Sequence, residues 1–332
     1  MPFLLHSMSV DATEIARAKP ERRLPLPASA RPVRVEWVYA AGVAGCHLLA
    51  LAAFLPWLFS WTGVILAVLG IYAFGTLGVH VGYHRLLAHR SFSTPKWLER
   101  TFALLGACAM QDTPAMWVAT HRRHHQFADD EPDPHSPLVS FLWAHFGWFV
   151  IKNDDHVRAR LFDRYARDML RDPLYAALER YLWGVVFASW CLFFLAGFIV
   201  ELALGGAPAQ ALQLGLSFLV WGVFVRVVVA WHITWSINSV SHLWGYRNYE
   251  TGDASRNNLL LGIIAGGEGW HNNHHADPGS ARHGHKWWEL DVGWLSIRAL
   301  MRLGLATDVA MPSPHLATRF RSRQPGEKVT TG

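Results

Sequence analysis

The longest uncharged stretch of the chain restricts its fold more than any other feature. Residues from Trp37 to His84 include no Asp, Glu, Lys or Arg. As a single helix this stretch would be roughly 70 Å long, about twice the ~30 Å hydrocarbon core of a bilayer. The chain therefore has to reverse direction, and Pro56 and Gly63 in FLPWLFSWTG favour a turn there. We predict two membrane spans, over residues 37–56 and 61–83.

A second apolar block, residues 181–235, has the same character, with Glu201 and Arg226 as its two charged residues. The segment ELALGGAPAQ divides it into predicted spans at 181–201 and 210–235. Uncharged runs of this length that arrive in pairs favour membrane helices over the buried core helices of a water-soluble protein. The predicted fold is an all-α membrane protein, with four transmembrane helices in two hairpins and a helical cytoplasmic cap.

The positive charges predict the orientation of these spans. Of the 30 Lys and Arg residues, 6 fall in residues 1–36, 13 in 84–180 and 10 in 236–332, and the turns inside the hairpins have none. Because cytoplasmic loops are enriched in Lys and Arg, both termini should be cytoplasmic, and we expect a multi-pass protein of the bacterial inner membrane. The net charge of +5 fits a membrane-facing cap, and no motif indicates nucleic-acid binding. The expected organisation is a disordered tail (1–34), a membrane domain (35–312, with cap segments 84–180 and 236–312) and a flexible tail (313–332).

Histidine is the second unusual feature, with 19 residues, eight of them in three runs. The runs are HRLLAH (His84, His89), HRRHH (His121, His124, His125) and HNNHH (His271, His274, His275). Helical residues three and four apart share a face, so each H-x-x-H-H run can point its imidazoles one way. His84 and His89 would lie about 140° apart on an α-helix, which suits two neighbouring ions better than one.

Eight clustered imidazoles predict a metal site. Without a metal they would repel each other when protonated and would need many partners when neutral. A structural zinc site has about four ligands and usually includes thiolate, whereas Cys46, Cys108 and Cys191 lie singly in apolar surroundings, so two ions are the expected number. Imidazole suits Zn, Cu, Fe and Ni. A membrane metal transporter or sensor is an alternative, but these ligands lie beyond the span ends, whereas transport sites lie near mid-membrane.

The residues around these runs resemble the histidine-box signature of integral-membrane fatty-acid desaturases. The segments GVHVGYHRLLAHRSF, HRRHHQFADDEPDPH, NSVSHLWG and GEGWHNNHH are most similar to the acyl-CoA Δ9 (stearoyl-CoA-type) branch, in a bacterial form without a cytochrome b5 domain. The similarity extends over about residues 70–310.

The resemblance implies a di-iron centre, O2 as cosubstrate, two electrons from an external donor such as a ferredoxin or flavoprotein reductase, and a cis double bond inserted into a saturated long-chain acyl-CoA or acyl-lipid. It also implies that the eight histidines bind iron, that His242 is a ninth ligand, and that Asn238 reaches one iron through water. Zinc can replace iron on overproduction. A fatty-acid hydroxylase or monooxygenase is the nearest alternative, because both reactions begin with hydrogen abstraction.

Further side chains are expected to support this centre. Metal-bound imidazoles usually donate their other N–H to a carboxylate, and we expect Glu268 and Asp133 to accept, with His80 in a hydrogen-bonding role beside His84. Substrate contacts are predicted for Arg85, Arg122, Arg123, Trp117, Trp231, Trp235 and Asn258, although positive-inside charge and interfacial tryptophan explain most of these equally well. His47 and His145 are interpreted as isolated histidines, and His232 as a residue that lines the substrate path or satisfies a backbone group.

Overall fold

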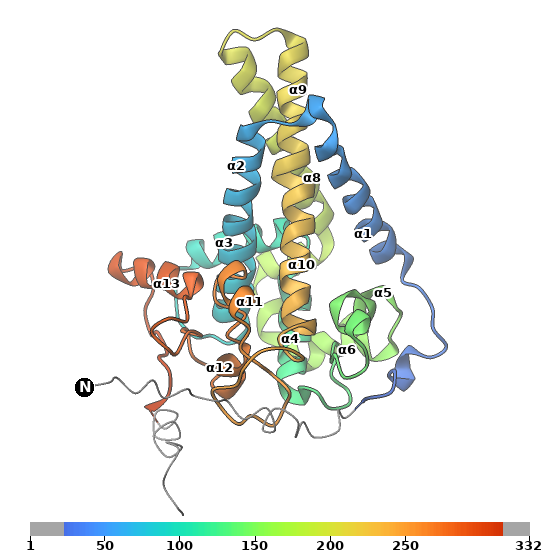
Figure 1. Ribbon diagram of the computed structural model, residues 1–332, viewed down its shortest axis with the longest axis vertical. Coiled ribbons are helices and arrows are strands. Elements are labelled where there is room, and N and C mark those ends of the chain that lie inside the picture. The colour runs from blue at the N-terminus through green and yellow to red at the C-terminus, as the bar shows by residue number, and fades with distance from the viewer. Residues whose placement is uncertain (1–22, 315–332) are drawn as a thin grey trace, which may run out of the picture.

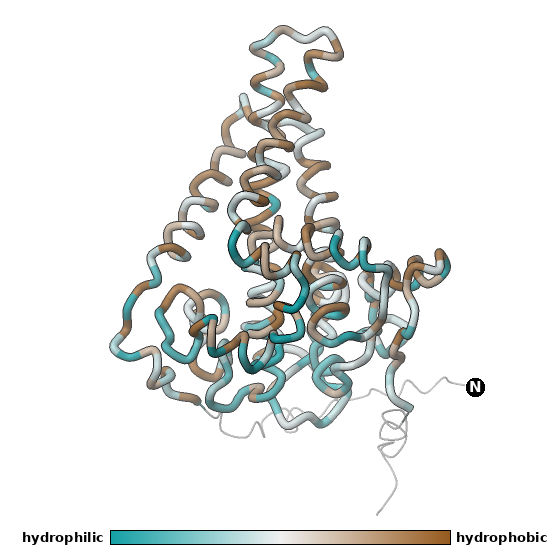
Figure 2. The backbone as a smooth tube through the Cα atoms, turned by 180° about the vertical axis from the view of Figure 1, so that it is seen from behind, coloured by the Kyte–Doolittle hydropathy of each residue, from teal (hydrophilic) through white to brown (hydrophobic). Residues whose placement is uncertain are grey.

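The computed structural model describes residues 23–314, and this part of the chain is helical, with isolated bridges but no β-strand. Four helices are long and apolar enough to cross a membrane: Trp37–Phe54, Trp61–Ala88, Pro173–Ala203 and Pro208–Ser239. They form a narrow tower on a wide base (Figure 1), and the hydrophobic colour follows the tower while hydrophilic colour gathers in the base (Figure 2). The prediction of an all-α membrane protein with four spans is confirmed. The last three helices extend beyond the predicted spans.

The tower consists of two helical hairpins. The first hairpin contains α1 (Trp37–Ala50), η2 (Leu51–Phe54), η3 (Pro56–Leu58), α2 (Trp61–Gly70) and the π-helix η4 (Ile71–Ala88); the second contains α8 (Pro173–Ala203), α9 (Pro208–Leu219), the π-helix η8 (Val220–Val225) and α10 (Arg226–Ser239). Ser60 begins α2 by accepting a hydrogen bond from the Gly63 N–H at 2.9 Å. Pro208 stands at the first position of α9, where its missing N–H costs no helical hydrogen bond.

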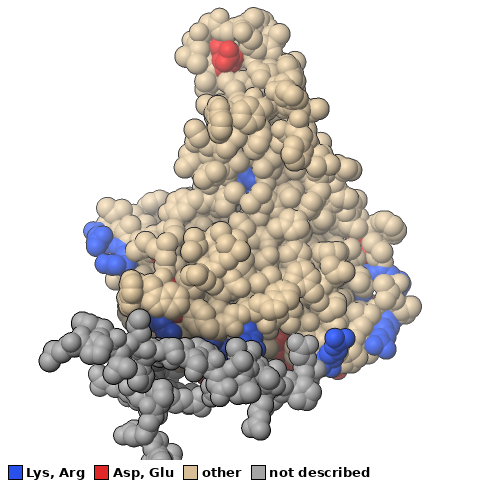
Figure 3. Space-filling view, viewed as in Figure 1, with Lys and Arg blue, Asp and Glu red and all other residues tan. Residues whose placement is uncertain are grey.

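The base, which we call the cap, comprises residues 89–172 and 240–314. Its helices are α3 (Lys96–Cys108), α4 (Pro114–Phe127), η5 (Trp143–Gly147), α5 (Trp148–Val150), η6 (Asp154–His156), α6 (Arg158–Leu161), η7 (Phe162–Ala166), α7 (Arg167–Leu170), α11 (Leu259–Ile264), α12 (His271–Ala276) and α13 (Val292–Arg302), and η1 (Ala28–Ala30) precedes the first span. Lys, Arg, Asp and Glu surround this base on the face drawn in Figure 3.

The α3 helix of the cap packs tightly against the second span. A methyl group at Gly78 of η4 would meet the backbone nitrogen of Gly106 at 2.5 Å, so the two helices approach to backbone contact. Arg226 of the fourth span is fully buried here, and its guanidinium donates to Cys108 O and Gly222 O. Because Cys108 ends α3, the cation lies where the helix dipole is negative.

The first span is the least embedded of the four. In its most apolar window 6% of the residues are buried, against 56% for the fourth span, and Cys46 is the one buried residue of α1. A helix with so little protein contact exposes most of its surface to lipid. This difference matters for the cavity that α1 borders.

The predicted tails lie partly outside the described residues, since residues 1–22 and 315–332 are not described. Residues 23–34, which belong to the predicted N-terminal tail, run along the cap. The Leu24 N–H donates to Leu138 O at 3.0 Å, Ala30 is 1% exposed, and Arg34 O accepts from the Lys152 N–H at 2.8 Å. Backbone hydrogen bonds to the cap hold this segment, which composition alone could not reveal.

Candidate metal centre

Four separate segments bring histidines together where the tower meets the cap. His84 lies in η4, the HRRHH residues on α4, His242 just after α10, and the HNNHH residues on α12. The imidazoles form two groups, in each of which every residue offers a nitrogen within 4.8 Å of the others: His84, His89, His121, His125 and His274 (group one), and His124, His242, His271 and His275 (group two). The three predicted runs therefore converge, and His242 joins them.

The π-helix explains how His84 and His89 belong to one group. Their ring centroids lie 4.8 Å apart, and the His89 N–H donates to His84 O at 3.1 Å, an i→i+5 bond. In a π-helix residues five apart are one turn apart, whereas an α-helix would separate them. The expectation that this pair serves two different ions is wrong for this geometry, because it assumed α-helical periodicity.

Each H-x-x-H-H run is divided between the two groups. On α4, His121 and His125 face group one and His124 faces group two. On α12 the assignment is reversed, with His274 in group one and His271 and His275 in group two. Residues i+3 and i+4 lie on opposite sides of residue i, so one run can contact two neighbouring points. Each run therefore contributes to both groups, and its three imidazoles do not converge on a single point.

Four imidazoles donate their Nδ1–H to buried carboxylates. The pairs are His84–Glu268 at 2.6 Å, His124–Asp133 at 3.0 Å, His242–Asp129 at 2.7 Å and His275–Asp253 at 2.7 Å. Glu268 and Asp133 lie where the sequence predicted them. Asp129 and Asp253 were not assigned this position; Asp253 stands in the loop before α11 with no motif around it, so only the folded chain reveals its contact.

Burial keeps most of these imidazoles neutral. It lowers the pKa of His89, His121, His125, His271 and His274 well below the ordinary range, and neighbouring histidines lower it further. Burial also lowers the pKa of His275, to about 4, although Asp253 opposes the shift. His242 differs: burial lowers its pKa, but the Asp129 carboxylate outweighs burial and raises it. Neutral rings present lone pairs, which metal binding requires.

The Nε2 atoms of these imidazoles, on the side of each ring away from its carboxylate, face one another. His124 and His275 both use Nδ1–H on a carboxylate, so in their neutral forms both Nε2 atoms carry lone pairs, and these atoms lie 3.4 Å apart. His271 Nε2 lies 3.0 Å from both His242 Nε2 and His275 Nε2. A single proton on His271 Nε2 could form a hydrogen bond to one of these nitrogens but not to both. A cation between the rings would satisfy all of these lone pairs at once. The donor set therefore fits metal ions.

The buried charges point to two divalent ions. The four carboxylates at the imidazoles carry four negative charges, and the fully buried Arg85 guanidinium is shared by Glu268 and Asp291. Arg85 balances Asp291, so four charges stay uncompensated among these groups. Buried charges need opposite charge nearby, and two divalent cations would provide four.

Three more histidines lie beside the groups. His135 is within ligand distance of His124 and Asp133, and burial lowers its pKa to about 3. His283, which the sequence analysis did not single out, has Nδ1 at 3.4 Å from Glu268, and its ring centroid is 4.5 Å from that of His274. His80 is 4% exposed, and neither of its ring nitrogens has a hydrogen-bond partner within the described residues, so the expected hydrogen bond is not present.

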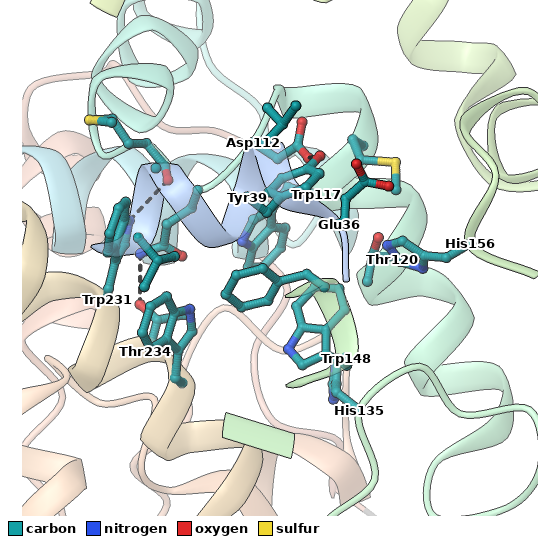
Figure 4. A pocket seen from close by; sticks show the side chains of 18 of the residues that line it. Glu36, Tyr39, Asp112, Trp117, Thr120, His135, Trp148, His156, Trp231 and Thr234 are labelled. Atoms are coloured by element: carbon teal, nitrogen blue, oxygen red, sulfur yellow. Dashed lines mark hydrogen bonds between the residues drawn. The ribbon is translucent and has the colours of Figure 1, made fainter. Parts of the chain in front are cut away.

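An apolar cavity of about 480 Å³ leads to the histidine groups. Its walls include Trp117 and Trp231, two predicted substrate contacts (Figure 4). They also include the third predicted contact, Trp235, together with Asn238 and His121. The Trp117 ring stacks on His121 with centroids 4.9 Å apart at 22°. The volume lies within the ~300–1,000 Å³ typical of small-molecule sites. The cavity thus joins an apolar channel to one edge of the candidate metal centre.

The predicted polar substrate contacts are occupied elsewhere. Arg85 donates to Glu268, Asp291 and Ala281 O; Arg122 donates to Asp168 and to carbonyls of Leu87, Ala88 and Tyr165; Arg123 donates to Pro132 O and Asp155 O; and the Asn258 side chain accepts from Leu261 N–H at the start of α11. None of these four residues borders the cavity. Protein groups away from the cavity therefore engage these side chains, and their contact with substrate stays a prediction.

Fold and site together describe a helical membrane protein with a histidine-rich candidate metal centre at the foot of an apolar cavity. The fatty acid desaturase family model matches residues 55–307. Three relatives are the sn-1 stearoyl-lipid 9-desaturase of Anabaena variabilis (42% identical, 84% of this chain and 95% of its own length), the sn-2 palmitoyl-lipid 9-desaturase of Nostoc sp. strain 36 (41%, 86% and 94%), and the icosanoyl-CoA 5-desaturase of Limnanthes douglasii (41%, 82% and 72%).

This chain belongs to the fatty acid desaturase family. It is accordingly an enzyme, an oxidoreductase that acts on fatty acyl chains. The predicted family resemblance is confirmed, and the transporter or sensor alternative is set aside.

Proposed function

We propose that this chain is an oxygen-dependent acyl desaturase that uses two histidine-bound iron ions to insert a cis double bond at carbon 9 of a saturated chain carried on a membrane lipid or on CoA. The observation that carries the proposal is the convergence of nine imidazoles in two groups, with His121 of group one in the wall of an apolar cavity. The names of the two cyanobacterial relatives support position 9 and a lipid carrier. The Limnanthes relative is named for position 5 on CoA.

In this proposal group one holds one iron ion and group two holds the other. Asn238, which borders the cavity, would complete one of the two sites through a water molecule. With O2 and two external electrons, the bound iron ions would supply the oxidant that removes hydrogen from an unactivated methylene. Imidazole binds zinc as well, so zinc is expected to compete during overproduction.

The chain itself positions the substrate and excludes water. The acyl chain lies in the cavity against Trp117 and Trp235, with the reacting carbons next to His121 and Asn238. The stack of Trp117 on His121 fixes this edge of the centre relative to the cavity wall. Which carbons stop there decides the double-bond position, since a near-attack geometry of about 3–3.5 Å leaves no freedom to slide. The apolar walls keep water from the reacting site.

The orientation in the membrane and the electron donor belong to the same proposal. We place the cap and both termini in the cytoplasm of a bacterial inner membrane, supported by the positive charge of the segments outside the hairpin turns. The electrons then come from a soluble carrier such as a ferredoxin or a flavoprotein reductase.

Lipid analysis of producing cells tests the proposal. The chain would be produced in a bacterium with no 9-desaturase, with a His271→Ala variant as control. The expected result is new C16 and C18 monoenes with the double bond at carbon 9, absent in the variant and without O2, and about two iron ions per purified chain. Saturated lipids alone, from iron-loaded protein with a working reductant, would refute the proposal, and hydroxy acids as the main product would replace it with hydroxylation.

A further inference from the structure

Three histidines outside the metal centre form a hydrogen-bonded file between three elements. His47 Nε2 of α1 lies 3.0 Å from His232 Nε2 of α10, and His232 Nδ1 lies 3.0 Å from His145 Nε2 of η5. His145 Nδ1 in turn lies 3.0 Å from Ser239 Oγ. We call His47, His232 and His145 the imidazole file. From the sequence, His47 and His145 were interpreted as isolated histidines, and His232 as a residue that lines the substrate path or satisfies a backbone group, because the three are far apart in the chain.

The hydrogen bonds of the file run in one direction. His47 Nδ1 lies 2.7 Å from Val43 O, a carbonyl that only accepts, so the proton of neutral His47 is on Nδ1 and its Nε2 accepts from His232. His232 Nδ1 then accepts from His145, and His145 Nδ1 faces the Ser239 hydroxyl, whose single proton goes either to this nitrogen or to Trp235 O, also at 3.0 Å. Because His232 uses its two nitrogens on different partners, the rings do not converge on one point. The imidazole file therefore links helices to one another and does not have the geometry of a metal site.

The imidazole file lies along a wall of the cavity. Val43, whose carbonyl fixes His47, lines the cavity, and so do Trp231 and Trp235, which flank His232 on α10. The His145 ring centroid is 5.7 Å from that of Trp235. His232 itself is exposed at the protein surface, on a span that faces lipid. The file therefore holds α1 against α10 where they separate the cavity from the bilayer.

Apart from the file, α1 is held by apolar packing and by its first turn. Val43, Cys46 and Ala50 belong to one hydrophobic cluster with Phe224 and Trp231. At the first turn the Tyr39 hydroxyl donates to Asp112 at 2.6 Å and accepts from Arg158 at 3.2 Å. Between helices in lipid the hydrophobic effect gives no driving force for contact, and one hydrogen bond favours the docked state by about threefold to thirtyfold. A wall whose helices are joined by a few hydrogen bonds and by apolar packing that lipid tails can replace is able to open thermally.

The charged residues of the cavity wall indicate which acyl carrier delivers the chain. The charged residues that line it form opposite pairs: Lys152 lies 3.8 Å from Glu36, and Arg158 contacts Asp112 and also Glu179. A CoA carrier has several phosphates, which unpaired cations would bind best. A lipid-borne chain needs none, and it moves from lipid tails into an apolar cavity without crossing water.

We propose that the imidazole file is the latch of a lateral gate between α1 and α10, through which the saturated acyl chain of a bilayer lipid enters the cavity. The proposal rests on the proposed desaturase function for its substrate. His47, His232 and His145 then decide which acyl carriers can deliver a chain to the centre.

The first test measures the gate without activity. In a background with Cys46, Cys108 and Cys191 replaced by alanine, spin labels are placed at Leu48 and Val229, which are 68% and 39% exposed. Electron–electron distances are recorded in lipid nanodiscs. The double variant His47→Leu/His232→Leu should broaden the distribution and lengthen its mean, since the latch is lost. An unchanged distribution would overturn the gate.

The second test closes the gate. In the same cysteine-free background, His47→Cys and His232→Cys are bridged with a cleavable bifunctional thiosulfonate, and desaturation of distearoyl phosphatidylglycerol in nanodiscs is followed. At least a tenfold loss is expected, restored when a reductant cleaves the bridge; the single-cysteine variants control for the reagent. Full turnover with the bridge intact would refute the gate while the desaturase function stands. No product from the unbridged protein would count against the proposed function, and the distance measurement would still judge the gate.

Discussion

Asp253→Asn isolates the part of the centre that the sequence did not reveal. Asp253 accepts the Nδ1–H of His275 at 2.7 Å and is 10% exposed. Its other oxygen accepts from the Ser255 N–H and the Thr251 hydroxyl. Asparagine has the same shape but one acceptor oxygen. With Oδ1 on His275, its NH2 group replaces the oxygen that accepts from the Ser255 N–H, so the substitution removes the negative charge and this second acceptor while His275 keeps its partner.

The magnitude follows from the hydrogen bond. A bond to a charged group contributes about 1.5–3 kcal/mol and a neutral one about 0.5–1.5 kcal/mol, so the loss is roughly 1–1.5 kcal/mol. Loss of charge also makes the imidazole a poorer ligand, and substitutions of such outer carboxylates typically weaken metal binding about 10–100-fold. Group two should weaken by that factor, and group one should keep its affinity because none of its ligands contacts Asp253.

The assay is competition with a chelator of known affinity, with iron per chain counted by mass spectrometry. Wild-type protein should lose its two ions at higher chelator concentrations, and Asp253→Asn should lose one ion about 10–100-fold earlier while keeping the other. Asp163→Asn, a surface control whose side chain is 76% exposed, should behave as wild type. Equal retention of both ions by Asp253→Asn would show that the carboxylate does not support group two, and the charge-balance reasoning would fail.

Three further predictions test the cavity, the titration and the packing. Gly42→Phe, on the cavity wall with open space around its Cβ, should lower acyl turnover at least tenfold by gas chromatography, whereas Gly45→Phe, equally open but away from the cavity, should not. Burial lowers the pKa of His156 to about 4, so as the pH falls the imidazole is protonated in the unfolded chain before it is protonated in the folded chain. Thermal melting of metal-free protein should therefore show a loss of stability between pH ~6.5 and ~4, by at most about 3 kcal/mol. The stability of His156→Gln should depend less on pH over this range. Gly78→Ala should destabilise the protein by about 1–3 kcal/mol in detergent melts because its methyl group meets backbone, and a melting temperature equal to that of Gly184→Ala, which meets nothing within 4 Å, would contradict the close helix contact.

The histidines of the candidate metal centre were predictable, but their grouping was not. Spacing on α4 and α12 indicated shared faces, and three runs in one chain indicated two ions. That His84 and His89 fall in one group depends on the π-helix, which hydrophobic periodicity does not distinguish from an α-helix. Asp253 and His283 reach the centre from irregular segments, where no periodic rule places a side chain.

The arginine predictions show a related limit. Arg85, Arg122 and Arg123 stand beside the histidine runs in sequence, which suggested contact with an anionic substrate. In the folded chain each guanidinium donates to protein carbonyls or carboxylates, because a side chain next to a metal-facing residue on a helix points to a different side. Neighbouring positions in sequence therefore say little about which side chains face the cavity.

The sequence by itself determined the four spans and the kind of site, since a long stretch without charge can only be satisfied in lipid and clustered imidazoles need cations. Tertiary structure decided which rings face one another, which carboxylates support them, and that His47, His232 and His145 meet across three elements. Those contacts depend on the rotation and approach of helices that lie far apart in the chain, and residue spacing within one helix carries no information about either.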